Sequence, residues 1–278
     1  MHKFITFLTR PGLQLEGLWL HLLPFLIRDY RWVEVHGLQV YGSAHHHRWL
    51  YRLLKGSFEP YTVQLFEQAI KPGMVVLDIG AYIGYFSLLA ALRLESRGKV
   101  YAFDCDFRNY RFLLHNVQLN GFGSRVEIIR KAVAHRVGVL PFHVYRADAT
   151  QSSLWHKRGK GSTVDVECTT VDDVLGSQPI HVVKMDIEGG EIQALKGMER
   201  TLAQSKEIVM FVECNPAALT SAGGSVESLL RELARLGFRV QVIDERERCL
   251  RPLDTEIIEA EYVRNGKYFV NLYCTKDT

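Results

Sequence analysis

The chain has little cysteine, little net charge and no long hydrophobic run. Its five cysteines are scattered and never spaced as CxxC, which indicates reduced thiols and gives no sign of a zinc site. The formal net charge is +3 over 278 residues, too small to indicate a nucleic-acid partner. The 47% of hydrophobic residues predicts a globular protein that can bury a large core, and the scattered cysteines favour a cytoplasmic location.

The N-terminal region also lacks the features of a membrane span. Its apolar stretch, Leu18–Ile27, is only ten residues long and is interrupted by Pro24, so it is too short to cross a bilayer. A small-residue cleavage site, which a signal peptide needs, is absent. We therefore expect residues 1–30 to form a helical segment packed on the main domain. The alternative is an interfacial helix that makes peripheral contact with a membrane.

A run of three histidines, His45-His46-His47, suggests a metal site at first sight. Adjacent side chains on an extended segment point in opposite directions, so the three imidazoles do not converge easily on one ion. We expect a solvated loop here, and the sequence predicts no metal site.

The most informative segment is Val75–Ala90, which reads as a buried strand, a glycine turn and an apolar helix. This is how a doubly wound α/β domain opens a nucleotide site. Gly80 and Gly84 flank Tyr82, at a position where a dinucleotide fingerprint requires glycine so that the backbone can approach a pyrophosphate. Tyr82 would crowd that phosphate. A cofactor without phosphates fits better, and S-adenosylmethionine (SAM) is the common one.

Two carboxylates complete this prediction. Asp78, at the end of the first strand, can take a hydrogen bond or a charge from the methionine part of SAM. Asp104 ends the next apolar run, 24 residues after Gly80, where an acidic side chain accepts hydrogen bonds from ribose hydroxyls. A valine at Gly80 is expected to place a branched side chain against the cofactor.

The rest of the chain alternates strands and helices. Residues 32–41 read as a hairpin turning at His36-Gly37, and residues 60–70 read as a helix. Strands are expected near 74–79, 100–104, 126–130, 181–186 and 207–213, and helices near 84–95, 107–120, 191–204 and 225–236. Parallel strands with crossovers of this length form a sheet with helices on both faces.

Two segments depart from this alternation. Residues 138–144 and 163–168 alternate like edge strands, with a polar loop between them that we expect to form part of the acceptor site over residues 145–162. Residues 238–243 and 268–273 read as a terminal antiparallel pair. The predicted fold is therefore α/β, a class I methyltransferase (Rossmann-like) doubly wound sheet with a terminal antiparallel hairpin, plus an N-terminal helical extension. The expected domains are 1–55 for the extension and 56–278 for the methyltransferase.

Acidic side chains gather where the fourth and fifth strands end. Period two puts Lys184, Asp186 and Glu188 on one face of the fourth strand, and Glu213 ends the fifth. Since ligands bind at the carboxyl ends of such strands, these residues are predicted to converge on one cleft. Crowded carboxylates raise one another's proton affinity, so Asp186 is the expected general base. Glu191 is expected instead to stabilise the N-terminus of the next helix.

Asn215-Pro216 matches only part of the Asn-Pro-Pro-aromatic motif of amino methyltransferases, and it follows the fifth strand rather than the fourth. This disfavours methylation of a base amine.

Seven motifs in order resemble the FkbM-type SAM-dependent methyltransferases. They are Gly56–Pro60, Leu77–Tyr85, Ala102–Tyr110, Lys131–Ala134, Thr169–Asp173, Lys184–Glu191 and Val212–Pro216. The resemblance implies O-methylation of a hydroxyl, often on a sugar or secondary metabolite, and adds Glu59 and Asp106 to the cofactor residues. Asp104 stands where the family usually has glutamate, Cys105 where it has proline, and Asn215 where histidine is frequent.

We therefore predict a SAM-dependent methyltransferase acting on a hydroxyl of a small molecule, sugar, glycan, lipid or secondary metabolite, with no nucleic-acid partner. One alternative is an RNA methyltransferase, against which the mild charge and the absent amino-methyl motif argue. Another is a non-catalytic SAM-fold interaction module. That alternative predicts loss of cofactor residues, yet Asp78, Gly80, Gly84 and Asp104 are all present.

Overall fold

The structure is a computed structural model and describes residues 32–43, 46–144, 152–154, 161–254, 258 and 269–276. The chain divides into two compact units, Met1–Phe58 and Glu59–Thr278, which are described separately below. The helix predicted over residues 1–30, with its apolar stretch, lies outside the described residues, and so does most of the segment 145–162.

The first unit contains the predicted hairpin. Strands β1 (Trp32–Val35) and β2 (Leu38–Tyr41) pair antiparallel. His36 (φ 54°) and Gly37 (φ 75°) both adopt the left-handed conformation, as a two-residue turn matched to the strand twist requires. Helix α3 (His47–Leu54), which the sequence analysis did not predict, follows the hairpin and buries Leu50 and Leu53.

The histidine run is not a solvated loop at its centre. His46 is only 3% exposed, and its Nδ1 accepts a hydrogen bond from the backbone N–H of Ser43 at 2.9 Å. The Ser43 hydroxyl lies 2.8 Å from the same nitrogen. The expectation of a solvated loop was wrong for His46 because its ring is used to fix the turn before α3.

The second unit is built on an eight-stranded sheet with the strand order β12-β11-β13-β10-β9-β3-β4-β5. In chain order its strands are β3 (Val75–Ile79), β4 (Lys99–Phe103), β5 (Val126–Ile129), β9 (Val182–Met185), β10 (Ile208–Cys214), β11 (Arg239–Asp244), β12 (Cys249–Pro252) and β13 (Val270–Lys276). The first five are parallel, whereas β13 runs antiparallel between β10 and β11. This strand order confirms the predicted class I methyltransferase fold.

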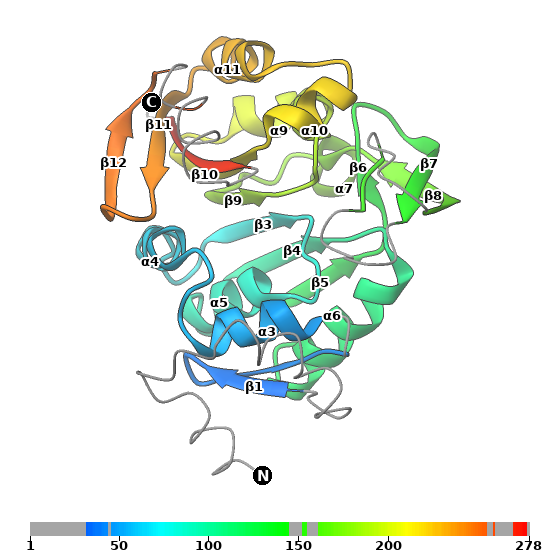
Figure 1. Ribbon diagram of the computed structural model, residues 1–278, viewed down its shortest axis with the longest axis vertical. Coiled ribbons are helices and arrows are strands. Elements are labelled where there is room, and N and C mark those ends of the chain that lie inside the picture. The colour runs from blue at the N-terminus through cyan, green and yellow to red at the C-terminus, as the bar shows by residue number, and fades with distance from the viewer. Residues whose placement is uncertain are drawn as a thin grey trace, which may run out of the picture. The chain divides into compact units, whose positions relative to one another are not determined.

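Helices cover both faces of the sheet (Figure 1). They are α4 (Pro60–Ala69), α5 (Tyr85–Arg93), α6 (Phe107–Leu119), α7 (Val171–Leu175), α8 (Glu191–Lys196), α9 (Glu199–Gln204), α10 (Pro216–Ser221) and α11 (Val226–Arg235). In Figure 1, α5 and α6 lie on one side of the sheet and α9 and α11 on the other. None of the helices among the described residues combines the length and hydrophobicity needed to cross a bilayer.

The alternation of side chains along the strands decides which residues can meet in a site. Leu77, Ile79, Val183 and Met185 belong to the main apolar core. The residues between them point to the other face, where the ammonium of Lys184 lies 5.2 Å from the centre of the Phe86 ring of α5. Because of this alternation, the polar side chains of β3, β9 and β10 lie on the face of the sheet that α5 covers.

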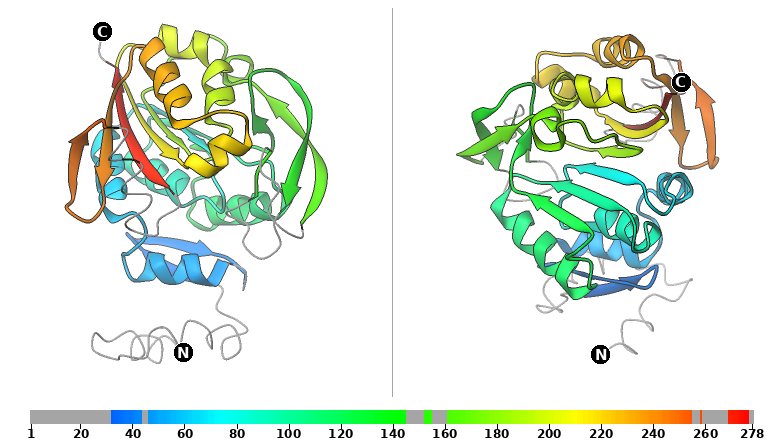
Figure 2. Two further views of the ribbon diagram at one scale, coloured as in Figure 1. Left: turned by 45° about the horizontal axis from the view of Figure 1, so that its top comes forward. Right: turned by 180° about the vertical axis from the view of Figure 1, so that it is seen from behind.

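The predicted edge strands form a sheet of their own. Strand β7 (Gly138–Val144) pairs antiparallel with β8 (Ser162–Thr169), and β8 pairs with β6 (Ala132–Val133). Figure 2 shows β7 and β8 at one margin of the unit, with β11 and β12 at the opposite margin. Both predicted strands are confirmed, and β7 is an edge strand of its sheet, whereas β8 lies between β6 and β7.

A broken helix and the pairing of the last strands also differ from the prediction. The helix expected over residues 191–204 is broken into α8 and α9 at Gly197-Met198. A Cβ atom on Gly197 would lie 2.0 Å from the carbonyl oxygen of Ala134, so a glycine permits this close approach of two chain segments.

The terminal antiparallel pair is confirmed as β11 and β13, but the hairpin itself is β11–β12, and β13 is inserted beside β10.

Candidate cofactor and catalytic site

The turn after β3 is held against the ends of two neighbouring strands. Gly80 (φ 90°), Tyr82 (φ 53°) and Gly84 (φ 98°) all have positive φ, and the N–H groups of Gly80 and Ala81 donate to the Phe103 carbonyl. A Cβ atom on Gly80 would lie 1.9 Å from the carbonyl oxygen of Asp186. The expectation that Gly80→Val meets the cofactor is therefore corrected, because its side chain would first displace the end of β9.

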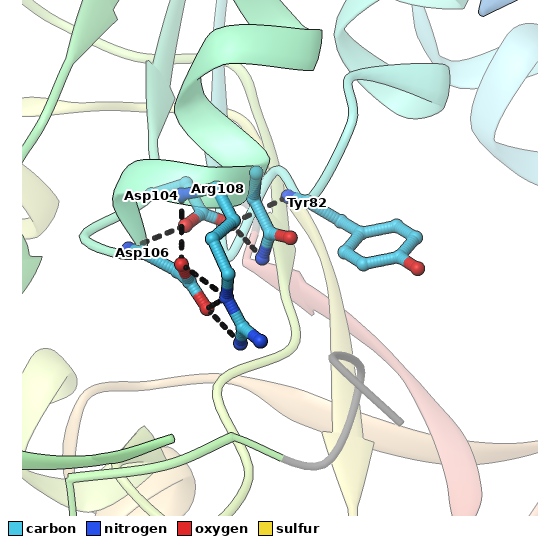
Figure 3. Close-up of polar contacts among 5 residues, drawn as sticks. Tyr82, Asp104, Asp106 and Arg108 are labelled. Atoms are coloured by element: carbon cyan, nitrogen blue, oxygen red, sulfur yellow. Dashed lines mark hydrogen bonds and ion pairs between the residues drawn. The ribbon is translucent and has the colours of Figure 1, made fainter. Parts of the chain in front are cut away.

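The carboxylate of Asp104 is fixed from three directions (Figure 3). Oδ1 accepts the N–H of Asp106 at 2.8 Å, and Oδ2 accepts the N–H of Tyr82 at 2.9 Å and Nδ2 of Asn109 at 3.3 Å. Burial, and then the charge of Asp106, raise the pKa of Asp104 to about 8. The turn that carries Tyr82 thus depends on the carboxylate that was predicted to bind ribose.

The carboxylate of Asp106 caps the N-terminus of α6. Its Oδ1 accepts the N–H of Arg108 at 2.8 Å as the N-cap of α6, and its Oδ2 pairs with the Arg108 guanidinium at 2.5 Å. The phenol ring of Tyr82 points away from this pair (Figure 3). A direct cofactor contact by Asp106 stays a prediction, whereas its contacts in the structure hold Asp104 and α6.

A buried lysine organises the acidic residues. Lys184 is 1% exposed, and its Nζ lies 3.4 Å from Oδ2 of Asp186, whose side chain is 32% exposed. Burial lowers the pKa of Lys184, but the charges of nearby carboxylates outweigh it and raise that pKa above its usual range. These carboxylates are Asp186, Glu59, Glu213 and Asp78. Lys184 therefore remains a cation, but it cannot balance all of them.

Asp78 lies opposite Lys184 in the β3–β9 pairing, but its side chain is buried. The residue is 2% exposed, β3 continues to Ile79, and Oδ2 accepts a 2.5 Å hydrogen bond from the Ser87 hydroxyl of α5. Burial raises the pKa of Asp78 to about 6, although the Ser87 hydrogen bond opposes the shift. Its contacts in the structure are with Ser87 and Lys184, and its predicted contact with the methionine part of SAM stays a prediction.

Glu213 is the least satisfied carboxylate of the group. It is 4% exposed, and its Oε1 has no hydrogen-bond partner among the described residues. Burial, followed by the charges of Asp186 and Glu188, raises its pKa well above the usual value. Carboxylate oxygens of Glu59, Asp186 and Glu213 lie within 4.8 Å of one another, a spacing that a cation could occupy and that the sequence analysis did not anticipate.

Glu59 reaches this group from the start of α4. It adopts the left-handed conformation (φ 43°) at the N-cap, yet its side chain does not cap the helix. Its Oε2 instead accepts Nδ2 of Asn271 on β13 at 2.9 Å. The N–H groups of Tyr61 and Thr62 are capped by Glu245, at 2.8 and 2.9 Å. Glu245 thus leaves the Glu59 carboxylate available to the site.

The turn after β9 is held by polar contacts on all sides. Glu188 has φ 52°, an unfavourable conformation for a non-glycine residue, and its Oε2 accepts Nδ2 of Asn215 at 2.9 Å. The Ser153 hydroxyl donates to the Glu188 carbonyl at 2.7 Å. Oε1 of Glu191 accepts the N–H groups of Ile187 and Gly189, so Glu191 contacts the backbone of its own turn.

Comparison with known proteins identifies the family. The profile described as Methyltransferase FkbM domain matches residues 78–240, more than half of the chain and the whole region from Asp78 through the acidic turn. The chain belongs to the FkbM methyltransferase family. It is therefore a SAM-dependent methyltransferase, and SAM is its cofactor.

One curated relative is also described as a methyltransferase. Methyltransferase sdnD from Sordaria araneosa is 29% identical over 189 residues, which is 56% of this chain and 71% of that protein. Two solved structures are similar in fold. A SAM-dependent O-methyltransferase from Thermotoga maritima is 13% identical, with a TM-score of 0.44 over 79% of this chain and 64% of that one. An rRNA methylase from Streptococcus thermophilus is 12% identical, with a TM-score of 0.44 over 78% and 95%.

The residues of this FkbM domain fit SAM as a cofactor. SAM carries positive charge on its sulfonium and on its ammonium group, and the carboxylates around Lys184 outnumber the cations there. Two buried acceptor atoms, Oδ1 of Asn109 and Oε1 of Glu213, have no partner among the described residues and could accept hydrogen bonds from a ligand. Asp104 would hold the ribose, and the carboxylates near Lys184 would face the charged end.

Several of the residues in this site were not predicted. Asn109 lies on the first turn of α6, and Asn271 lies opposite Glu213 in the β10–β13 pairing. Ser153 and Asn215 act on Glu188 from two separate segments. A spacing signal exists only for Asn109, five residues after Asp104, because the other contacts depend on how distant segments pair.

Proposed function

We propose that this FkbM methyltransferase methylates a hydroxyl group of a small molecule, glycan or lipid, with Asp186 as the general base. The observation that carries the proposal is the position of Asp186. Its carboxylate follows the carboxyl end of β9, is one-third exposed, and is paired with a lysine that is fully buried. It is thus open to a substrate on one side and held in place on the other.

Each residue has a separate task in this proposal. SAM supplies an electrophilic methyl group. Asp186 accepts the proton that the hydroxyl loses as its oxygen forms the new bond. Lys184 stays charged and orients the Asp186 carboxylate through the 3.4 Å contact. Glu213, which is buried and holds its proton more tightly than usual, is the reserve candidate for the base, together with Glu188.

The acceptor is proposed to lie beside the segment 145–162. Of this segment, Ser152–Leu154 is described, and Ser153 is 1% exposed. Ser153 exchanges two backbone hydrogen bonds with His143 on β7, at 2.8 and 3.1 Å, and donates its hydroxyl to Glu188. This part of the segment is therefore fixed to the turn after β9 that also carries the proposed base, which supports a role in acceptor binding.

The base is tested by single-turnover methyl transfer at saturating SAM. Asp186→Asn keeps the size of the side chain but cannot accept a proton, so we expect a rate loss of roughly a hundredfold to ten-thousandfold. Asp165→Asn, at an exposed position on β8, is the matched control and should keep the native rate. If Asp186→Asn transfers the methyl group at nearly the native rate while Glu213→Gln or Glu188→Gln shows no transfer, Asp186 is not the general base.

The acceptor class is tested with methyl-labelled SAM and separate fractions of small molecules, glycans, lipids and RNA. We expect label in an alkali-stable ether from one of the first three fractions. Label in RNA would favour the nucleic-acid alternative. Tight SAM binding with no transfer to any fraction would favour a non-catalytic module.

A further inference from the structure

The hydrogen-bonding capacity of Asp104 is almost used up by the protein itself. An ionised carboxylate offers about four lone-pair sites. Both sites on Oδ2 are taken, by the N–H of Tyr82 and by Nδ2 of Asn109, and one site on Oδ1 is taken by the N–H of Asp106. One acceptor site remains, on Oδ1. The ribose of SAM presents two neighbouring hydroxyls, so Asp104 alone cannot accept from both without losing a contact.

A second acceptor lies on the residue that holds Asp104. Asn109 is 4% exposed, and its Oδ1 has no hydrogen-bond partner among the described residues. The orientation of the amide is fixed, because only its Nδ2 can donate to the Asp104 carboxylate. An unpaired buried carbonyl oxygen is costly, and it gains most from a ligand that brings a donor.

We infer that Asn109 is a specificity residue of the SAM site, in which its Oδ1 accepts from one ribose hydroxyl while the free site on Oδ1 of Asp104 accepts from the other. The inference rests on the cofactor assignment and adds a residue to it. Asn109 lies at the third helical position of α6, after the N-cap Asp106, so its side chain is carried by a helix rather than by a loop. Recognition of the ribose would thus be divided between a charged and a neutral acceptor.

The test is nucleoside selectivity, which needs no methyl acceptor. Displacement of labelled S-adenosylhomocysteine by adenosine, 2′-deoxyadenosine and 3′-deoxyadenosine is measured at pH 9, where Asp104 is ionised. The native chain should prefer adenosine to each deoxynucleoside, by roughly 2- to 13-fold for a hydrogen bond of ordinary strength. Asn109→Leu, of similar shape, should abolish the preference against one deoxynucleoside and keep the preference against the other.

Two controls separate this result from a general loss of structure. Gln118→Ala, at an exposed position on the same helix, should leave both preferences unchanged. Asn109→Ala gives a second variant in case the leucine is not accommodated. An equal loss of affinity for all three nucleosides in both Asn109 variants would mean that Asn109 only supports the turn, and the inference would be wrong.

The native chain provides the remaining outcomes. If it binds S-adenosylhomocysteine but does not distinguish adenosine from both deoxynucleosides, the inference fails while the cofactor assignment stands. If it binds neither S-adenosylhomocysteine nor SAM, the cofactor assignment itself fails.

Discussion

At the scale of single residues, the site is governed by an excess of negative charge around one cation. Lys184 faces Glu59, Asp78, Asp186 and Glu213 in a largely buried setting. One ammonium cannot offset four carboxylates there, so the protonated forms of the buried carboxyl groups are favoured more than they would be in water. Burial is the main cause of the raised pKa values of Asp78, Glu59 and Glu213, and the negative charge of Asp186 adds to it.

Removing the cation should destabilise the protein in a pH-dependent way. In Lys184→Met the carboxylates lose their buried partner, which typically costs about 3–5 kcal/mol of unfolding free energy. The loss should be larger near pH 8 than near pH 5, because the raised pKa values of Asp78, Glu59 and Glu213 mean that these carboxyl groups carry more negative charge at the higher pH. Urea unfolding of the native and variant chains at both pH values measures it. An equal loss at both values would show that Lys184 contributes by packing alone.

A chelator should not stop the reaction. The oxygens of Glu59, Asp186 and Glu213 are close enough to hold a cation, but the ammonium of Lys184 already lies beside them. We therefore expect methyl transfer to continue after dialysis against EDTA. Loss of transfer that added Mg²⁺ restores would instead assign a metal to these three carboxylates.

Asp104 should make cofactor binding depend on pH. The pKa of its carboxyl group is raised to about 8, so below that pH it is mostly protonated and is a poorer acceptor for ribose hydroxyls. Affinity for adenosine, which does not itself titrate in this range, should rise from pH 6 to pH 9 by at most about tenfold per pH unit. Calorimetry on the native chain and on Asp104→Asn measures it, and the variant should show a flat profile.

At the scale of elements, the sequence was enough to predict most strands and helices. It did not predict the long-range contacts that break or cap them. The β3 strand, the glycine turn and α5 follow from apolar runs and from Gly80 and Gly84, which are local signals. The break at Gly197 was missed because its cause is the carbonyl of Ala134, more than sixty residues away. In the same way, the capping of α4 by Glu245 joins segments that no local pattern connects.

The Glu245 cap should stabilise α4 and, through it, the position of Glu59. Its carboxylate accepts the N–H groups of Tyr61 and Thr62 and also the Thr62 hydroxyl. Glu245→Ala should cost about 0.5–2 kcal/mol of unfolding free energy, the usual range for a lost N-cap. Hydrogen exchange should quicken at the start of α4. Glu247→Ala, an exposed residue of the same turn, is the control, and an effect of equal size there would argue against capping.

At the scale of the whole molecule, alternating strands and helices were enough to predict the class I sheet. The position of β13 between β10 and β11 and the separate sheet of β6, β7 and β8 were not predictable, because strand order depends on long-range pairing. For the site, residue types at strand ends predicted Lys184, Asp186 and Glu213. The contacts of the Asn215 and Asn271 amides could not be predicted from the sequence, because their partners, Glu188 and Glu59, lie far away in the chain.

The N-terminal region gives the last prediction. The apolar stretch Leu18–Ile27 is ten residues long, about half of what a membrane-spanning helix needs. We expect the full chain to remain in the supernatant after cell fractionation, or to leave membranes on washing with salt or carbonate. A chain lacking residues 1–31 should show no membrane association and should bind S-adenosylhomocysteine with unchanged affinity. Release of the full chain by detergent alone would contradict peripheral contact. Weaker binding by the shortened chain would mean that this segment contributes to the cofactor site.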